Sequence, residues 1–271
     1  MVERVGDAGD RALSLADTPS DREAPVTINL IEVADLRTVL KLGIDDFRAI
    51  PTHAFFVGAI YAVLGLFIIR WSFDYSLLPL VFPIIGGFAL VGPFAALGLY
   101  ALSKRREQGM EARFWHMFEV LKSPNRGAIL RLGIGVALLF LAWLGVAMAL
   151  LRSTFGDAEL AMSSFAGALF STSHGWTLVI VGNLVGALFA LAILAGTAIA
   201  FPMLLDRKVD VATAVATSLR VFAKNPGPML AWGVIVGVSL FLGAIPFLLG
   251  LLAVLPILGH ATWHLYRKTV S

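Results

Sequence analysis

The chain has 271 residues, of which 58% are hydrophobic and only 14% are charged, against about 25% charged in soluble domains. Long stretches carry no charge at all, so helices there would lack the polar face that a soluble helix needs, and the solvent around them must be lipid. The absence of cysteine excludes disulfides, thiolate metal sites and cysteine nucleophiles.

The N-terminal residues 1–28 form the first predicted unit. They mix acidic and basic residues and contain no apolar segment of the kind found in a secretory signal. We expect a disordered tail there, followed by an integral membrane domain over residues 29–268.

Apolar stretches over residues 54–69, 77–102, 132–151 and 176–203 each predict one membrane-crossing helix. A fifth stretch, residues 229–266, would be about 57 Å long as one helix, which is too long for a core of about 30 Å. We expect it to form two helices joined by a turn at Gly243–Pro246. The fold class is therefore all-α, a polytopic membrane protein with six transmembrane helices in three hairpins.

The positions of lysine and arginine predict the orientation. Nineteen of the 21 lie before residue 54, in 104–131, in 207–224 or at the C-terminus, whereas only Arg70 and Arg152 lie in the other gaps. Loops rich in lysine and arginine stay in the cytoplasm, so both termini are expected there, and only an even number of spans permits this.

Each predicted hairpin follows an amphipathic segment that is expected to lie in the headgroup plane as an interfacial helix. These segments are Ala34–Ile50, Met110–Leu121 and the stretch after Asp210, a predicted N-cap. Each one ends near a proline, at Pro51, Pro124 or Pro226. The pattern indicates a degenerate threefold repeat of interfacial helix, proline break and hairpin.

Several motifs resemble those of a known bacterial family. They are Gly87–Pro93 with Gly98-Leu99-Tyr100 and Ser103–Arg106, Pro202–Arg207 with Asp210, Asn225-Pro226, and the ending Gly259-His260-Ala261-Thr262-Trp263-His264-Leu265-Tyr266-Arg267. The family consists of predicted integral membrane proteins of unknown function that are common in proteobacteria. The resemblance covers about residues 28–268 and departs at Ala101, where a glutamate is expected. It implies a multi-pass protein of the bacterial inner membrane and supplies no activity.

His260 and His264 are four residues apart, so they share one face of the last helix and could bind one metal ion. His53 is a conceivable third ligand. Ala261 stands where a zinc protease of the HExxH type has its glutamate, which excludes that reaction. The simpler interpretation places both histidines in an interfacial belt with Trp263 and Tyr266.

Asn183 is the most polar residue expected deep in the membrane, between Gly182 and Gly186. The simplest interpretation is that its side chain forms a hydrogen bond across a helix contact. The more specific alternative is that it binds a substrate. Prolines interrupt the second helix of each hairpin, a feature of some transporters. No acidic or basic residue is placed at mid-membrane to couple ions.

We expect a non-enzymatic membrane protein that acts as a scaffold or accessory subunit of another membrane complex. A transporter of a small solute or lipid is the alternative, and a haem- or metal-binding membrane protein is the second alternative. Expected partners are membrane lipids, including anionic headgroups, and other membrane proteins, with no nucleic acid. No bound cofactor and no catalytic residue is expected.

Overall fold

The computed structural model describes residues 26–50, 96–156, 162–246 and 248–271, together with isolated positions between 63 and 92. These residues form nine α-helices and one 3-10 helix: α2 (Asp35–Ala49), α6 (Leu97–Glu107), η3 (Phe114–Lys122), α7 (Arg126–Phe155), α8 (Met162–Ser171), α9 (Ser173–Thr197), α10 (Ala200–Asp206), α11 (Val211–Lys224), α12 (Pro226–Ala244) and α13 (Leu251–Thr269). The all-α prediction is confirmed for this part of the chain.

The first and third amphipathic segments form helices close to their predicted bounds, as α2 and α11. Asp210 caps α11 as expected, because its side chain accepts a hydrogen bond of 2.6 Å from the backbone N–H of Thr213. Helix α2 does not simply lie at a surface. Leu36, Val39 and Gly43 are buried, mainly against α13.

The second amphipathic segment differs from the prediction of an α-helix over Met110–Leu121. After Gly109, which has a φ of +69°, the chain is extended and then forms the 3-10 helix η3. Its apolar residues recur every three positions in two sets. The first set is Phe114, Met117 and Val120, and the second is Trp115, Phe118 and Leu121. A 3-10 helix has three residues per turn and aligns such sets on whole faces.

Three described helices are long and apolar enough to cross a membrane: Arg126–Phe155, the pair of α9 and α10 over Ser173–Asp206, and Pro226–Ala244. They correspond to the third, fourth and fifth predicted spans. Helix α9 ends just before Ala198 and Ile199, and α10 continues after them. The break lies one turn before Pro202, which has no N–H to bond the carbonyl of Ala198.

The long apolar stretch at the C-terminal end divides as predicted. Helix α12 ends at Ala244, and α13 begins at Leu251 after a turn in which Leu248 has a φ of +66°. Helix α8 was not predicted and occupies part of the loop between the third and fourth spans. The first predicted span, most of the second, His53 and the tail up to residue 25 lie outside the described residues.

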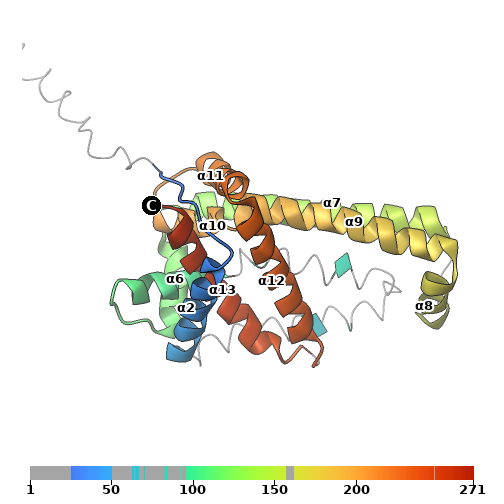
Figure 1. The fold of residues 1–271 in the computed structure, drawn as a ribbon, viewed down its shortest axis with the longest axis horizontal. Coiled ribbons are helices and arrows are strands. Elements are labelled where there is room, and N and C mark those ends of the chain that lie inside the picture. The colour runs from blue at the N-terminus through green and yellow to red at the C-terminus, as the bar shows by residue number, and fades with distance from the viewer. Residues whose placement is uncertain are drawn as a thin grey trace, which may run out of the picture.

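Helices α7 and α9 run side by side toward α8, which lies at their far end, whereas α12 runs in a different direction (Figure 1). Helices α2, α6, α10, α11 and α13 gather at one end of α7 and α9, and we call this group the platform. The main hydrophobic core lies in it, around Ile199–Leu204 and Leu258–Tyr266. Ile28 pairs with Val270 in an isolated β-bridge, so the start of the described chain is fastened to its end.

Candidate functional site

The C-terminal motif on α13 points into the platform. His260, Trp263 and Tyr266 have almost no exposed surface. This overturns the interpretation of these residues as an interfacial belt, which would leave them at the membrane surface. A helix flanked by α2, α6 and α10 must bury several faces, so its polar side chains require internal partners.

Asp46 of α2 is the centre of the largest buried polar cluster among the described residues. One carboxylate oxygen, Oδ2, lies 2.8 Å from Nε2 of His264 and accepts a hydrogen bond of 2.6 Å from the hydroxyl of Ser103. The other oxygen, Oδ1, pairs with the guanidinium group of Arg106. One carboxylate thus joins α2 to both α6 and α13.

His260 joins the same cluster through Ser103, whose Oγ lies 2.8 Å from Nδ1 of the imidazole ring. Because the hydroxyl proton of Ser103 points at Asp46, the hydrogen between Ser103 and His260 belongs to Nδ1. The Nε2 atom of His260 is then an acceptor, and it has no hydrogen-bond partner among the described residues.

The charge state of Asp46 follows from two opposing effects. Burial raises the pKa of Asp46, but hydrogen bonds from His264 and Ser103 outweigh burial, so the pKa lies below the ordinary value. The carboxylate is therefore ionised at neutral pH and can serve as an acceptor for all of its neighbours.

Two further carboxylates bind α13 in the same way. Glu107 of α6 accepts hydrogen bonds of 2.9 Å from the indole N–H of Trp263 and 2.8 Å from Nε of Arg267. Asp206 of α10 accepts one of 2.8 Å from the hydroxyl of Tyr266 and pairs with Lys104 at 3.0 Å. Three helices thus each present one acid to the C-terminal motif.

This arrangement brings serine, histidine and aspartate together, although the sequence showed no such set. Its order differs from that of a nucleophilic triad, in which histidine lies between serine and aspartate. Here the hydroxyl of Ser103 lies between Asp46 and His260. Ser103 and His260 have no exposed surface, so the cluster holds helices together and offers no nucleophile to a substrate.

The metal hypothesis for His260 and His264 finds no complete ligand set. The part of the chain that the structure describes contains no group of three or more histidine, aspartate and glutamate side chains suited to a metal ion. The two histidines share a helix face as predicted, but each ring is directed at Asp46 or Ser103. The proposed third ligand, His53, lies outside the described residues.

Asn183 does not bind across a helix contact. Its side-chain amide donates a hydrogen bond of 2.7 Å to the carbonyl of Val179, one turn earlier in α9, and the residue is exposed. Of its two glycine neighbours, Gly186 approaches Trp143 of α7, whereas a Cβ atom at Gly182 would meet nothing within 4 Å.

Sequence reasoning missed Asp46, Ser103, Glu107 and Asp206 as functional residues. The sequence does contain a signal for Asp46, because this acid falls on the apolar face of the predicted helix. The buried residues on that face recur at helical spacing: Leu36, Val39, Gly43 and Asp46. An acid at a core position of an amphipathic helix requires a buried partner. Nothing in the sequence identifies that partner as His264, which is 218 residues away.

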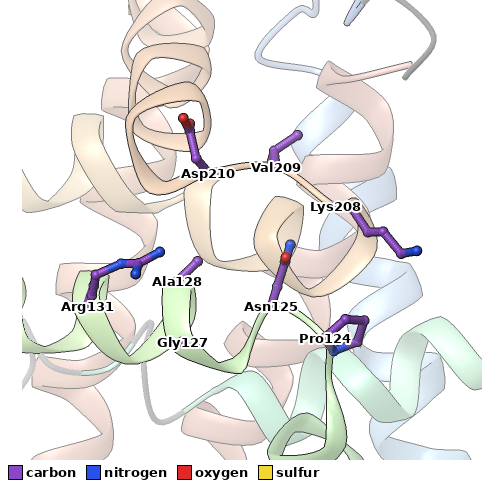
Figure 2. A pocket seen from close by; sticks show the side chains of 8 residues that line it. All are labelled: Pro124, Asn125, Gly127, Ala128, Arg131, Lys208, Val209 and Asp210. Carbon is purple, nitrogen blue, oxygen red and sulfur yellow. The ribbon is translucent and has the colours of Figure 1, made fainter. Parts of the chain in front are cut away.

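A shallow pocket of about 350 Å³ lies where α7 begins (Figure 2). Arg131 of α7 and Lys208 from the loop after α10 carry its positive charges. Asp210 also lines it, but that carboxylate caps α11, and this hydrogen bond lowers the pKa of Asp210. Asn125 closes the floor by donating to the carbonyls of Leu204 and Arg207.

Comparison with known proteins agrees with the resemblance seen in the motifs. No curated protein and no solved structure matches the chain. Residues 81–206, a little under half of the chain, match the family described as "Predicted integral membrane protein (DUF2189)". The match includes the Gly87–Pro93 motif and ends at Asp206, whereas the motif around His260 lies beyond it. Over residues 81–206 the chain is thus similar to this family of predicted integral membrane proteins, whose function is unknown.

Proposed function

We propose that this protein is a non-enzymatic scaffold or accessory subunit that binds other membrane proteins through the sides of its spans. The observation that carries the proposal is the low burial of the candidate spans. Their most apolar windows are only 11–17% buried within the structure, so most of their surface is available to lipid or to partner helices.

The platform supports this role because it is a rigid base with internal polar pairing. Asp46, Glu107 and Asp206 are all engaged by side chains of α13 or α6. A buried polar network of this kind fixes the relative positions of helices. The spans that leave the platform are thereby presented in fixed directions.

Small residues on the exposed sides of the spans favour contact with partner helices. A Cβ atom at Gly135 or Gly145 of α7, at Gly182 of α9 or at Gly237 of α12 would meet nothing within 4 Å. In membranes, close helix association commonly uses such residues because they allow backbones to approach. The side chain of Asn183 donates its hydrogen bond to the carbonyl of Val179 in the same helix. It is therefore not directed at a substrate, which favours a scaffold over a transporter.

We place the protein in the bacterial inner membrane with six spans and with both termini in the cytoplasm. The distribution of lysine and arginine supports this topology. The platform includes α10 and α13, and the starts of α7 and α12 pack into its core. In this topology, the platform is the cytoplasmic side of the molecule.

Purification of the full chain in a mild detergent tests the proposal. We expect a second membrane protein to co-purify in a fixed ratio and to be lost from Gly182→Leu and Gly237→Leu, which fill open faces without an internal clash. Leu188→Ile changes another exposed residue of α9 while keeping its bulk, so recovery should be unchanged. A strictly monomeric protein without a partner would refute the role.

A further inference from the structure

The 3-10 helix η3 has three distinct faces because residues three apart align in such a helix. Phe114, Met117 and Val120 form the inner face: Met117 packs against Gly98 of α6, and Val120 contacts the core. The polar face consists of His116, Glu119 and Lys122, and the third face consists of Trp115, Phe118 and Leu121.

The third face is apolar and uncovered. Trp115, Phe118 and Leu121 are 58%, 52% and 68% exposed. Three large apolar side chains aligned on one short helix are unusual on a water-facing surface, and such patches mark sites of interaction. The opposite face already packs on α6, so the outer face is free for an external partner.

The position of η3 in the chain indicates what that partner is. Only three residues separate Lys122, its last residue, from Arg126, where the candidate span α7 begins. Three residues reach at most about 11 Å, so η3 cannot leave the neighbourhood of the membrane boundary. The first turns of α7 also expose large apolar residues, Leu130 and Ile134.

Charge around the stripe favours an anionic surface. The segment from Lys104 to Arg131 holds seven basic and three acidic residues. The guanidinium group of Arg113 lies over the ring of Trp115, with 5.4 Å to the centroid, and Lys122 is exposed on the polar face. Basic residues next to tryptophan are typical of the headgroup layer of anionic membranes.

We propose that Trp115, Phe118 and Leu121 form a membrane anchor that inserts into the cytoplasmic leaflet, with Arg113 and Lys122 binding the phosphates of anionic phospholipids. This anchor is independent of the scaffold role, since it requires lipid and no protein partner. It sets the depth at which the platform sits on the membrane surface.

The absence of native cysteine allows a matched test in the full-length protein. Leu121→Cys and Lys122→Cys place an environment-sensitive nitrobenzoxadiazole label on adjacent residues that lie on the apolar and polar faces. In nanodiscs of phosphatidylcholine with phosphatidylglycerol, we expect blue-shifted emission and quenching by spin-labelled lipid at position 121. The label at position 122 should report a more aqueous environment and be quenched less.

A second arm replaces phosphatidylglycerol with phosphatidylcholine, which should reduce the quenching at position 121. Equal quenching without anionic lipid would refute the role of the headgroups. An aqueous signal at both positions, or equal quenching at both, would refute the stripe as an anchor. A blue-shifted label at position 121 that spin-labelled lipid does not quench would assign the face to a protein and also overturn the proposal.

Discussion

Asp46 shows how one side chain can organise this molecule. A carboxylate that is almost completely buried is costly unless donors surround it, and Ser103, Arg106 and His264 supply them. Hydrogen bonds to a charged acceptor contribute more than those between neutral groups. Removing the acid would leave two buried or partly buried donors, Ser103 and His264, without their acceptor, whereas the exposed Arg106 can turn to water.

We predict that Asp46→Ala lowers the stability of the folded protein by about 3 kcal/mol, in the range found when one partner of a buried pair is removed. Thermal unfolding of the purified protein in detergent measures the loss. Asp45→Ala, which removes the adjacent and more exposed acid, is the matched control. Equal destabilisation by the two variants would show that the cluster has no special role.

The same carboxylate predicts a response to acid. The pKa of Asp46 is lowered in the folded protein, so its contribution to stability is complete above the ordinary value of 3.8 and is lost as the pH falls through the lower folded-state value. We expect the unfolding midpoint of the wild type to fall more steeply below about pH 4 than that of Asp46→Asn. Parallel curves for the two proteins would contradict this prediction.

The sequence was sufficient to place the two histidines on one helix face, but it was not sufficient to identify their hydrogen-bond partners. The four-residue spacing of His260 and His264 placed them on one helix face. Their partners lie on α2 and α6, at separations of 157 residues from Ser103 to His260 and 218 from Asp46 to His264. Pairings over such distances depend on how the helices pack, which local patterns do not specify.

At the scale of elements, a close and extensive helix contact joins α2 to α13. A Cβ atom at Gly43 would lie 2.7 Å from the Cβ of Ala261 and 2.8 Å from the carbonyl oxygen of Ile257. Only glycine permits this approach, because one of the opposing atoms belongs to the backbone and cannot move aside. The contact brings Asp46, one turn later, within reach of His264.

We predict that Gly43→Ala destabilises the platform by about 1–3 kcal/mol, the usual cost of overpacking, and loosens α2. Limited proteolysis between residues 26 and 50 should become faster, and the unfolding temperature should fall. Gly135→Ala adds the same methyl group to an open helix face and should be neutral or stabilising. Unchanged proteolysis of Gly43→Ala would argue against a tight α2–α13 contact.

Helices were predictable where local signals agreed. The Asp210 cap located α11, and the excessive length of the last apolar stretch required the turn before α13. The 3-10 geometry of η3 was missed because Met110, Phe114 and Phe118 also fit an α-helical spacing. In the second and third units of the predicted repeat, an asparagine stands next to the proline, at Asn125 and Asn225. The side-chain amide of each donates a hydrogen bond to a backbone carbonyl that is distant in sequence. The first unit has no such asparagine.

At the scale of the whole molecule, packing is concentrated at one end. The core includes residues from α2, α6, α7, α9, α10, α11, α12 and α13. The far parts of α7 and α9 form a small separate cluster around Trp143 and Ala147, which Ile84 also joins. Such a shape is reasonable for a membrane protein, because apolar side surfaces are compatible with lipid and need no internal partner.

The orientation of this shape in the membrane gives the last prediction. Helix α9, whose first residue is Ser173, begins next to α8 and far from the platform (Figure 1). Ser271 follows α13 of the platform and is hydrogen-bonded to Thr27. If the platform is cytoplasmic, a single cysteine at Ser173 reacts with a membrane-impermeant maleimide added outside spheroplasts. A cysteine at Ser271 reacts only after the membrane is opened. Labelling of Ser271→Cys from outside would place the platform and both ends of the described chain outside, because Thr27 is hydrogen-bonded to Ser271, and would refute the orientation predicted from lysine and arginine.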